Sequence, residues 1–100
     1  MPDYQWYKSY DKGVPHTLAP YPEKTLLDVA DETARLRPGH NMIWFKGNEI
    51  NYGQFIKYVD DVAKALAGLG VKKGDRVALL MPNIPQMLIC QFATWRAGGI

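Results

Sequence analysis

The chain has 100 residues, the size of one domain or of part of one. Its formal net charge of +2 is too near zero to indicate a nucleic-acid partner, and its single cysteine, Cys90, excludes a secreted disulfide scaffold. Apolar residues make up 47% of the chain, which is typical of a globular protein with a core. No apolar run has the length of a signal peptide or a membrane span, so we expect a cytoplasmic protein with at most peripheral membrane contact.

Residues 1–22 differ in composition from the rest of the chain. They hold four of the seven prolines, four of the six tyrosines, and Trp6. Because proline fixes φ and removes a backbone donor, this segment is predicted to be an extended arm rather than a helix. Its aromatic side chains gain free energy when buried, so the arm is expected to lie either against its own domain or against a second copy of the chain.

The first helix is predicted to follow Thr25, a good N-cap residue with Asp28 three positions later. Asp31 and Arg35 are spaced to form an ion pair on this helix, and Pro38-Gly39 ends it. Its apolar residues form one broad face: Leu26, Leu27, Val29, Ala30, Ala34 and Leu36.

A hairpin and a second helix are predicted next. Residues 42–46 have the composition of a strand, Gly47-Asn48 has the form of a two-residue type II′ turn, and 49–51 is the short return strand. Asn51 is expected to cap the following helix, with Gln54 as its capping-box partner. The apolar residues of that helix recur at spacings of three and four and predict a core-facing stripe: Phe55, Ile56, Val59, Val62, Ala63, Leu66 and Leu69.

The last third of the chain has the pattern of a βα(β) unit. Residues 77–81 are apolar without alternation, which predicts a strand covered on both faces, as in a parallel sheet. Helix 86–97 is apolar nearly all round, and Ile100 is expected to begin another strand. A buried strand and an all-round apolar helix need neighbours that 100 residues scarcely provide. We therefore expect the front piece of a larger α/β protein.

Few residues are candidates for chemistry. The short motif Gly68-Leu69-Gly70 follows a helix rather than a strand, which disfavours a phosphate loop. His16 and His40 lie in separate loops without neighbouring metal ligands, and Cys90 is expected to be a buried, inert thiol.

The remaining polar candidates lie in the turn at 71–76 and at Asn83, just after strand 77–81. The bases of this turn are predicted to be solvated, with contact to an anionic partner as the alternative: Lys72, Lys73 and Arg76. Asp75 is expected to accept a hydrogen bond from a nearby backbone N–H. Asn83 is expected to cap the last helix, with a ligand role at the strand end as the alternative.

At residues 72–83, KKGDRVALLMPN, the sequence closely resembles the adenylate-forming, AMP-binding ligases. The segment 96–100, RAGGI, supports this resemblance, as does 51–55, NYGQF, which is similar to the family's Thr-Tyr-x-Glu-Leu helix start. The arm is similar to the lead-in of bacterial and archaeal long-chain fatty-acid–CoA ligases. The chain is thus identified as the N-terminal part of the family's large α/β domain, with 1–22 as the arm and 23–100 as an incomplete first segment.

This resemblance implies a two-step reaction in the intact protein. A fatty-acid carboxylate attacks the α-phosphate of ATP with the help of Mg²⁺, and the thiol of coenzyme A then displaces AMP. The family's catalytic, phosphate-binding and metal-binding motifs have no matching position here and are expected beyond Ile100. No catalytic, cofactor-binding or metal-binding residue is therefore assigned, and residues 1–100 are expected to be scaffold and inactive alone.

The resemblance also bears on partners. Some long-chain members dimerise by exchanging their arms, so Trp6, Tyr7 and Tyr10 are expected to contact a partner subunit, and the remainder of the domain is expected to cover helix 86–97. Two alternatives remain: another adenylate-forming branch, such as an aryl-acid ligase or a peptide-synthetase adenylation domain, and a truncated, non-catalytic interaction module.

Overall fold

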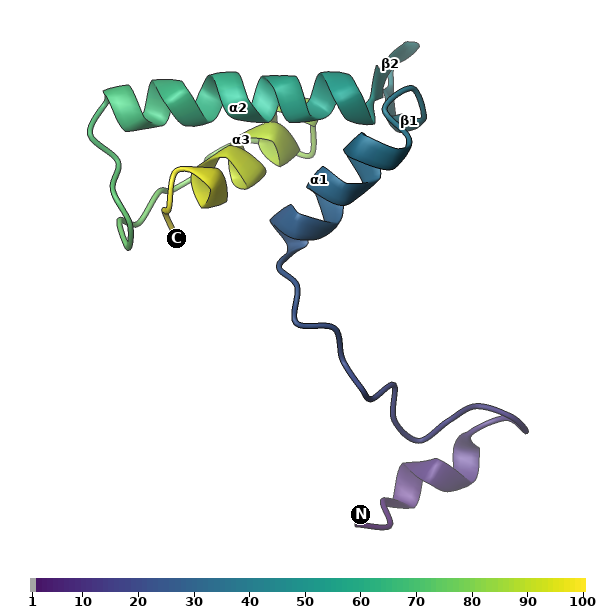
Figure 1. Cartoon of the computed structure of the whole chain (residues 1–100). Helices are drawn as coiled ribbons and strands as arrows, with labels where there is room; N and C mark the ends of the chain where they lie inside the picture. The colour runs from purple at the N-terminus through teal and green to yellow at the C-terminus, as the bar shows by residue number, and fades with distance from the viewer. Residues whose placement is uncertain (1) are drawn as a thin grey trace.

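The computed structural model describes residues 2–100, so Met1 of the predicted arm lies outside the described residues. Helices α2 and α3 lie side by side, α1 and the hairpin lie near the start of α2, and the arm extends away from all of them (Figure 1). The elements in chain order are η1 (Gln5–Ser9), α1 (Leu26–Leu36), β1 (Asn41–Phe45), β2 (Asn48–Asn51), α2 (Tyr52–Gly68) and α3 (Pro85–Arg96). Among residues 2–100, none of the helices is both long and apolar enough to cross a bilayer.

Helix α1 begins at the predicted capping box. The Asp28 N–H donates to Thr25 Oγ1 at 3.1 Å, and the Thr25 N–H donates to Asp28 Oδ2 at 2.9 Å. The broad apolar face of α1 is used only in part, because Ala30 alone is buried while Leu26, Val29 and Leu36 are exposed.

The capping box should make the stability of α1 depend on pH. Hydrogen bonds from the backbone and then the side chain of Thr25 lower the pKa of the Asp28 carboxyl below its ordinary value. A lowered folded-state pKa contributes stability that is present above the unfolded value of about 3.9 and is lost as the pH falls through the folded value. The difference in unfolding free energy between the wild type and Asp28→Ala should therefore shrink below about pH 4. A difference that stays constant down to about pH 2 would contradict this assignment.

The hairpin turn lies one residue earlier than predicted. Phe45 pairs with Asn48, so Lys46 and Gly47 form the turn and Asn48 is the first residue of β2. Both turn residues have positive φ, 49° at Lys46 and 81° at Gly47, which is the type I′ geometry that matches the twist of the strands. The type II′ prediction with glycine first was wrong because Lys46 adopts the left-handed conformation.

The core lies between α2 and α3. The predicted cap of α2 is confirmed, with the Gln54 N–H donating to Asn51 Oδ1 at 2.8 Å and the Asn51 N–H donating to Gln54 Oε1 at 3.0 Å. Leu69 was wrongly placed on the core stripe: it follows the last residue of α2 and is 84% exposed. The buried cluster combines three residues of α2 with two of α3: Phe55, Val59, Ala63, Ile89 and Ala93.

Residues 77–81 are not an assigned strand in the described part of the chain. They alternate between half-buried side chains at Val77, Leu79 and Met81 and exposed ones, with Leu80 94% exposed. The predicted cover on both faces is therefore absent from residues 2–100. Pairing nevertheless begins: the Ile100 N–H donates to the Asp75 carbonyl at 2.7 Å, and the Val77 N–H donates to the Ile100 carbonyl at 2.9 Å. These are the first two hydrogen bonds of a parallel pair, in agreement with the predicted βα(β) order.

Helix α3 begins without the predicted cap. Its N-cap residue is Ile84, which makes no side-chain capping hydrogen bond, and Pro85 occupies the first turn. The prediction that Asn83 caps the helix was wrong, because the helix begins at Pro85 and Asn83 lies one position before its N-cap residue.

The arm contains one short 3-10 helix, η1, where an extended segment was predicted. Apart from the half-buried Tyr7, every described residue of 2–22 is exposed, so the arm does not pack on the rest of residues 2–100. Its rings pack on one another instead. Tyr4 stacks on Trp6 with centroids 4.3 Å apart, and Tyr7 stacks on His16 at 3.7 Å.

Candidate functional site

Three helices are joined at Arg96, the last residue of α3. Its Nη1 and Nη2 atoms each donate to one carboxylate oxygen of Asp31 on α1, both at 2.6 Å. Its Nε atom lies 3.2 Å from Asp60 Oδ1 on α2, without the alignment of a hydrogen bond. We call these three residues the Arg96 clasp. The bond to Asp31 raises the pKa of the Arg96 guanidinium, and the charge of Asp60 adds to this effect.

The clasp was not predicted from the sequence. Asp31 was expected to pair with Arg35 within one helix, whereas the structure pairs it with Arg96, 65 positions along the chain. One signal was present: Arg96 is the only charged residue of α3. A charge on a helix that must be largely buried needs a partner, and Asp31 and Asp60 supply it.

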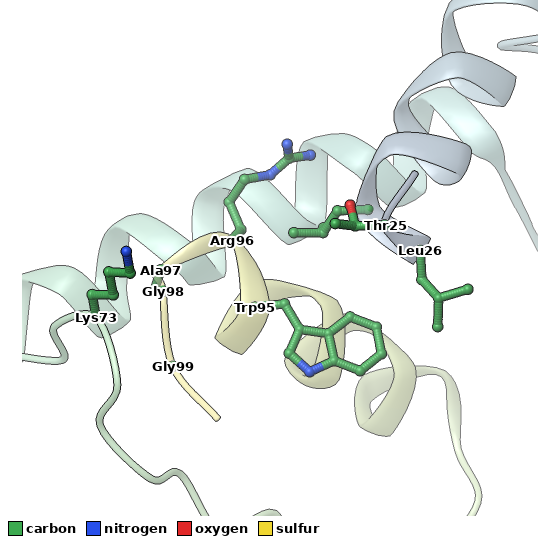
Figure 2. Close-up of a pocket in the computed structure, with 9 residues that line it drawn as sticks. Thr25, Leu26, Lys73, Trp95, Arg96, Ala97, Gly98 and Gly99 are labelled. Carbon is green, nitrogen blue, oxygen red and sulfur yellow. The ribbon is translucent and has the colours of Figure 1, made fainter. Parts of the chain in front are cut away.

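A hollow of about 540 Å³ lies beside the clasp, between the start of α1, the end of α3 and the turn that contains Lys73. Figure 2 shows the Trp95 ring extending from α3 toward Leu26, while the Arg96 side chain turns the other way. The wall is mainly apolar, and its charged members are Lys73 and the already paired Arg96. No histidine, cysteine or acidic side chain lines this hollow, so it offers a surface for packing rather than a catalytic group.

A second groove, of about 620 Å³, lies between the hairpin, α2 and α3. Cys90 lines it and is half-buried within residues 2–100, where a buried thiol was predicted. The one acid of the groove, Asp61, is paired with Lys57 at 2.8 Å.

The remaining candidate residues do not assemble into a site. Asp75 has its predicted task, since its Oδ2 accepts the Lys72 N–H at 2.7 Å. His16 stacks in the arm, and His40 lies 6.3 Å from the ring of Tyr52. Among residues 2–100, no three His, Cys, Asp or Glu side chains are grouped as metal ligands. Gly70 has a φ of 100°, which fits a stop after α2 rather than a phosphate loop.

The basic turn and Asn83 do not form a site together either. Lys72, Lys73 and Arg76 are all exposed, as expected of a solvated turn. Asn83 lines a shallow groove beside Ile43 and Phe45 of β1.

Comparison with known proteins finds relatives both by sequence and by fold. A family described as AMP-binding enzyme matches residues 30–100. A long-chain-fatty-acid–CoA ligase of Bacillus subtilis is 35% identical over 95 residues, which cover 95% of this chain and 17% of that protein. An acetyl-coenzyme A synthetase 1 of Candida albicans is 37% identical over 79 residues, which cover 73% of this chain and 12% of that protein.

Among solved structures, the N-terminal subdomain of Klebsiella oxytoca NpsA in complex with anthranilyl-AMSN matches with a TM-score of 0.77 at 25% identity. The match covers 85% of this chain and 22% of that one. It confirms the predicted fold class, that of the N-terminal subdomain of adenylate-forming enzymes. The chain spans less than a quarter of each of these relatives.

Proposed function

Because this chain belongs to the AMP-binding enzyme family of adenylate-forming ligases, we propose that it is the N-terminal scaffold of a fatty-acid–CoA ligase. The complete protein would activate a fatty-acid carboxylate with ATP and transfer the acyl group to coenzyme A. The chain spans 17% of the Bacillus subtilis ligase, so activity and substrate are proposed for the complete protein alone.

The reach of the alignments carries this proposal. The long-chain-fatty-acid–CoA ligases of Bacillus subtilis and Yersinia pestis each align with 95% of this chain, so most of the arm is included. The acetyl-coenzyme A synthetase of Candida albicans aligns with 73% of the chain, and triostin synthetase I of Streptomyces triostinicus with 77%. The wider alignment therefore favours the fatty-acid branch over the acetyl and amino-acid branches.

In the proposed reaction, the carboxylate oxygen bonds to the α-phosphorus of ATP and pyrophosphate leaves. The thiol sulfur then bonds to the acyl carbon and AMP leaves. Mg²⁺ supplies charge stabilisation on the phosphates. Residues 2–100 do not fit these ligands: they offer no glycine-rich loop after a strand and no carboxylate cluster. Their proposed role is to hold the α2–α3 layer and the first parallel pairing at Ile100.

The proposal is tested by carboxylate-dependent ATP–pyrophosphate exchange with the complete protein. Hexadecanoate should exceed acetate and anthranilate by at least about tenfold in kcat/KM, since a pocket for a long chain gains free energy from each buried methylene. Preference for anthranilate or acetate would select another branch. No exchange with any carboxylate would select the non-catalytic alternative. Residues 1–100 alone serve as the control and should show no exchange.

The exposed arm supports a second proposal, that its aromatic residues contact a partner subunit. Trp6 is 56% and Tyr10 is 40% exposed, and both belong to a preformed aromatic cluster. Deletion of residues 1–22 should shift the complete protein from dimer toward monomer in sedimentation velocity. A dimer of unchanged stability would contradict this assignment.

A further inference from the structure

Helix α1 is fixed to the rest of the fold in an unusual way. Among the described residues, the hydrophobic core and the side chains packed on it come from the hairpin, α2 and α3, and none comes from α1. Ala30 is the one buried side chain of α1, and three of its large apolar side chains are exposed: Leu26, Val29 and Leu36. Within residues 2–100, the apolar contacts of α1 are therefore limited to Ala30 and the half-buried Leu27 and Ala34.

The C-terminal end of α1 is tied to the start of α2 through the backbone. The Gly53 N–H donates to the Pro38 carbonyl, and the Tyr52 N–H donates to the His40 carbonyl, both at 3.0 Å. Gly53 fits closely there, since a Cβ atom would lie 3.3 Å from the Pro38 oxygen. These contacts fix a pivot at one end of the helix.

Beyond the pivot, the strongest polar contact of α1 with the body is the Arg96 clasp. The pair is bidentate and half-shielded, with side-chain exposures of 29% at Arg96 and 40% at Asp31. Charge-assisted, forked hydrogen bonds of this kind are stronger than ordinary surface ion pairs. The other ion pair of α1, between Lys24 and Glu32, joins the helix only to the residue before its cap.

We propose that α1 is a hinged strap that pivots at Pro38–His40, is fastened by the Arg96 clasp, and opens without unfolding the α2–α3 core. The arm runs into α1 through Thr25, so opening the strap also moves the arm and removes one wall of the hollow beside Trp95. Arg96 is thus a positioning residue for the arm. This inference does not depend on the proposed reaction.

Hydrogen exchange measured by mass spectrometry on the complete protein tests the strap. Asp31→Asn should accelerate exchange in the peptides of α1 by about tenfold, because a charge-assisted contact is lost. Peptides from α2 and α3 should change by less than about twofold, because the core remains closed. Raising NaCl from about 0.05 M to about 1 M should accelerate α1 exchange in the wild type and not in Asp31→Asn.

Two further variants make the result specific. Asp61→Asn breaks the Lys57–Asp61 pair within α2 and should leave α1 exchange unchanged. Asp60→Asn should have a smaller effect than Asp31→Asn, since Asp60 makes no aligned hydrogen bond to Arg96. Unchanged α1 exchange in Asp31→Asn would overturn the proposal, because another contact would then hold the helix. Equal acceleration in α1 and α2 would also overturn it, because opening would then require global unfolding.

Discussion

Phe55→Ala should destabilise the protein by about 3–5 kcal/mol, the usual range for removing a fully buried aromatic side chain. Phe55 has no exposed surface and lies in the middle of the cluster formed by α2 and α3. Its ring also meets Phe92 edge-on, with centroids 5.3 Å apart. Folded domains have net stabilities of only about 5–15 kcal/mol, so one such cavity removes a large part of the stability. Urea unfolding followed by circular dichroism measures the loss.

Leu69→Ala is the matched control for this substitution. Leu69 continues the same apolar spacing in the sequence, yet it is 84% exposed, so its truncation should cost less than about 0.5 kcal/mol. Equal losses at Phe55 and Leu69 would mean that another layer of structure covers the end of α2. A loss below about 1 kcal/mol at Phe55 would contradict the core described above.

Local signals in the sequence predicted the helices well. Thr25 with Asp28 and Asn51 with Gln54 form the capping boxes that their spacing indicated, because the interaction involves residues only three positions apart. The stripe of α2 was predicted correctly up to Leu66, since a period near 3.6 determines which side chains share a face. It failed at Leu69, where the helix had already ended.

Features that depend on distant residues or on exact backbone geometry were not predicted. The turn at Lys46-Gly47 required a non-glycine residue with positive φ, which no propensity favours. Asp31 had a nearby base at Arg35, so its true partner on α3 was hidden by a local alternative. The strand at 77–81 was predicted from composition, but a strand is defined by its partners, and residues 2–100 supply only the first pairing at Ile100.

In the candidate site, too, the local contacts were predicted and the contacts between distant residues were not. The sequence indicated correctly that Asp75 stabilises its own turn, a contact over three residues. The Arg96 clasp, which joins three helices, required the fold. Its sequence signal was nevertheless present. A single basic residue on an otherwise apolar helix predicts an acidic partner on the element that packs against that helix.

The second large effect is expected from overfilling the same core. Ala93 has no exposed surface, and it belongs to the same buried cluster as Ala63, another small residue on the facing helix. Small residues allow α2 and α3 to approach closely, so Ala93→Leu adds three carbon atoms where no space exists. The expected loss is about 1–3 kcal/mol, from displaced helices or strained rotamers.

Ala65→Leu is the control for Ala93→Leu, because Ala65 is on the exposed side of α2 and leucine is equally compatible with a helix. It should change stability by less than about 0.5 kcal/mol in the same urea titration. If Ala93→Leu is tolerated as well as Ala65→Leu, the two helices are not in close contact at this position. A loss at Ala93 alone would instead mean that the side chain at position 93 limits how closely α2 and α3 approach.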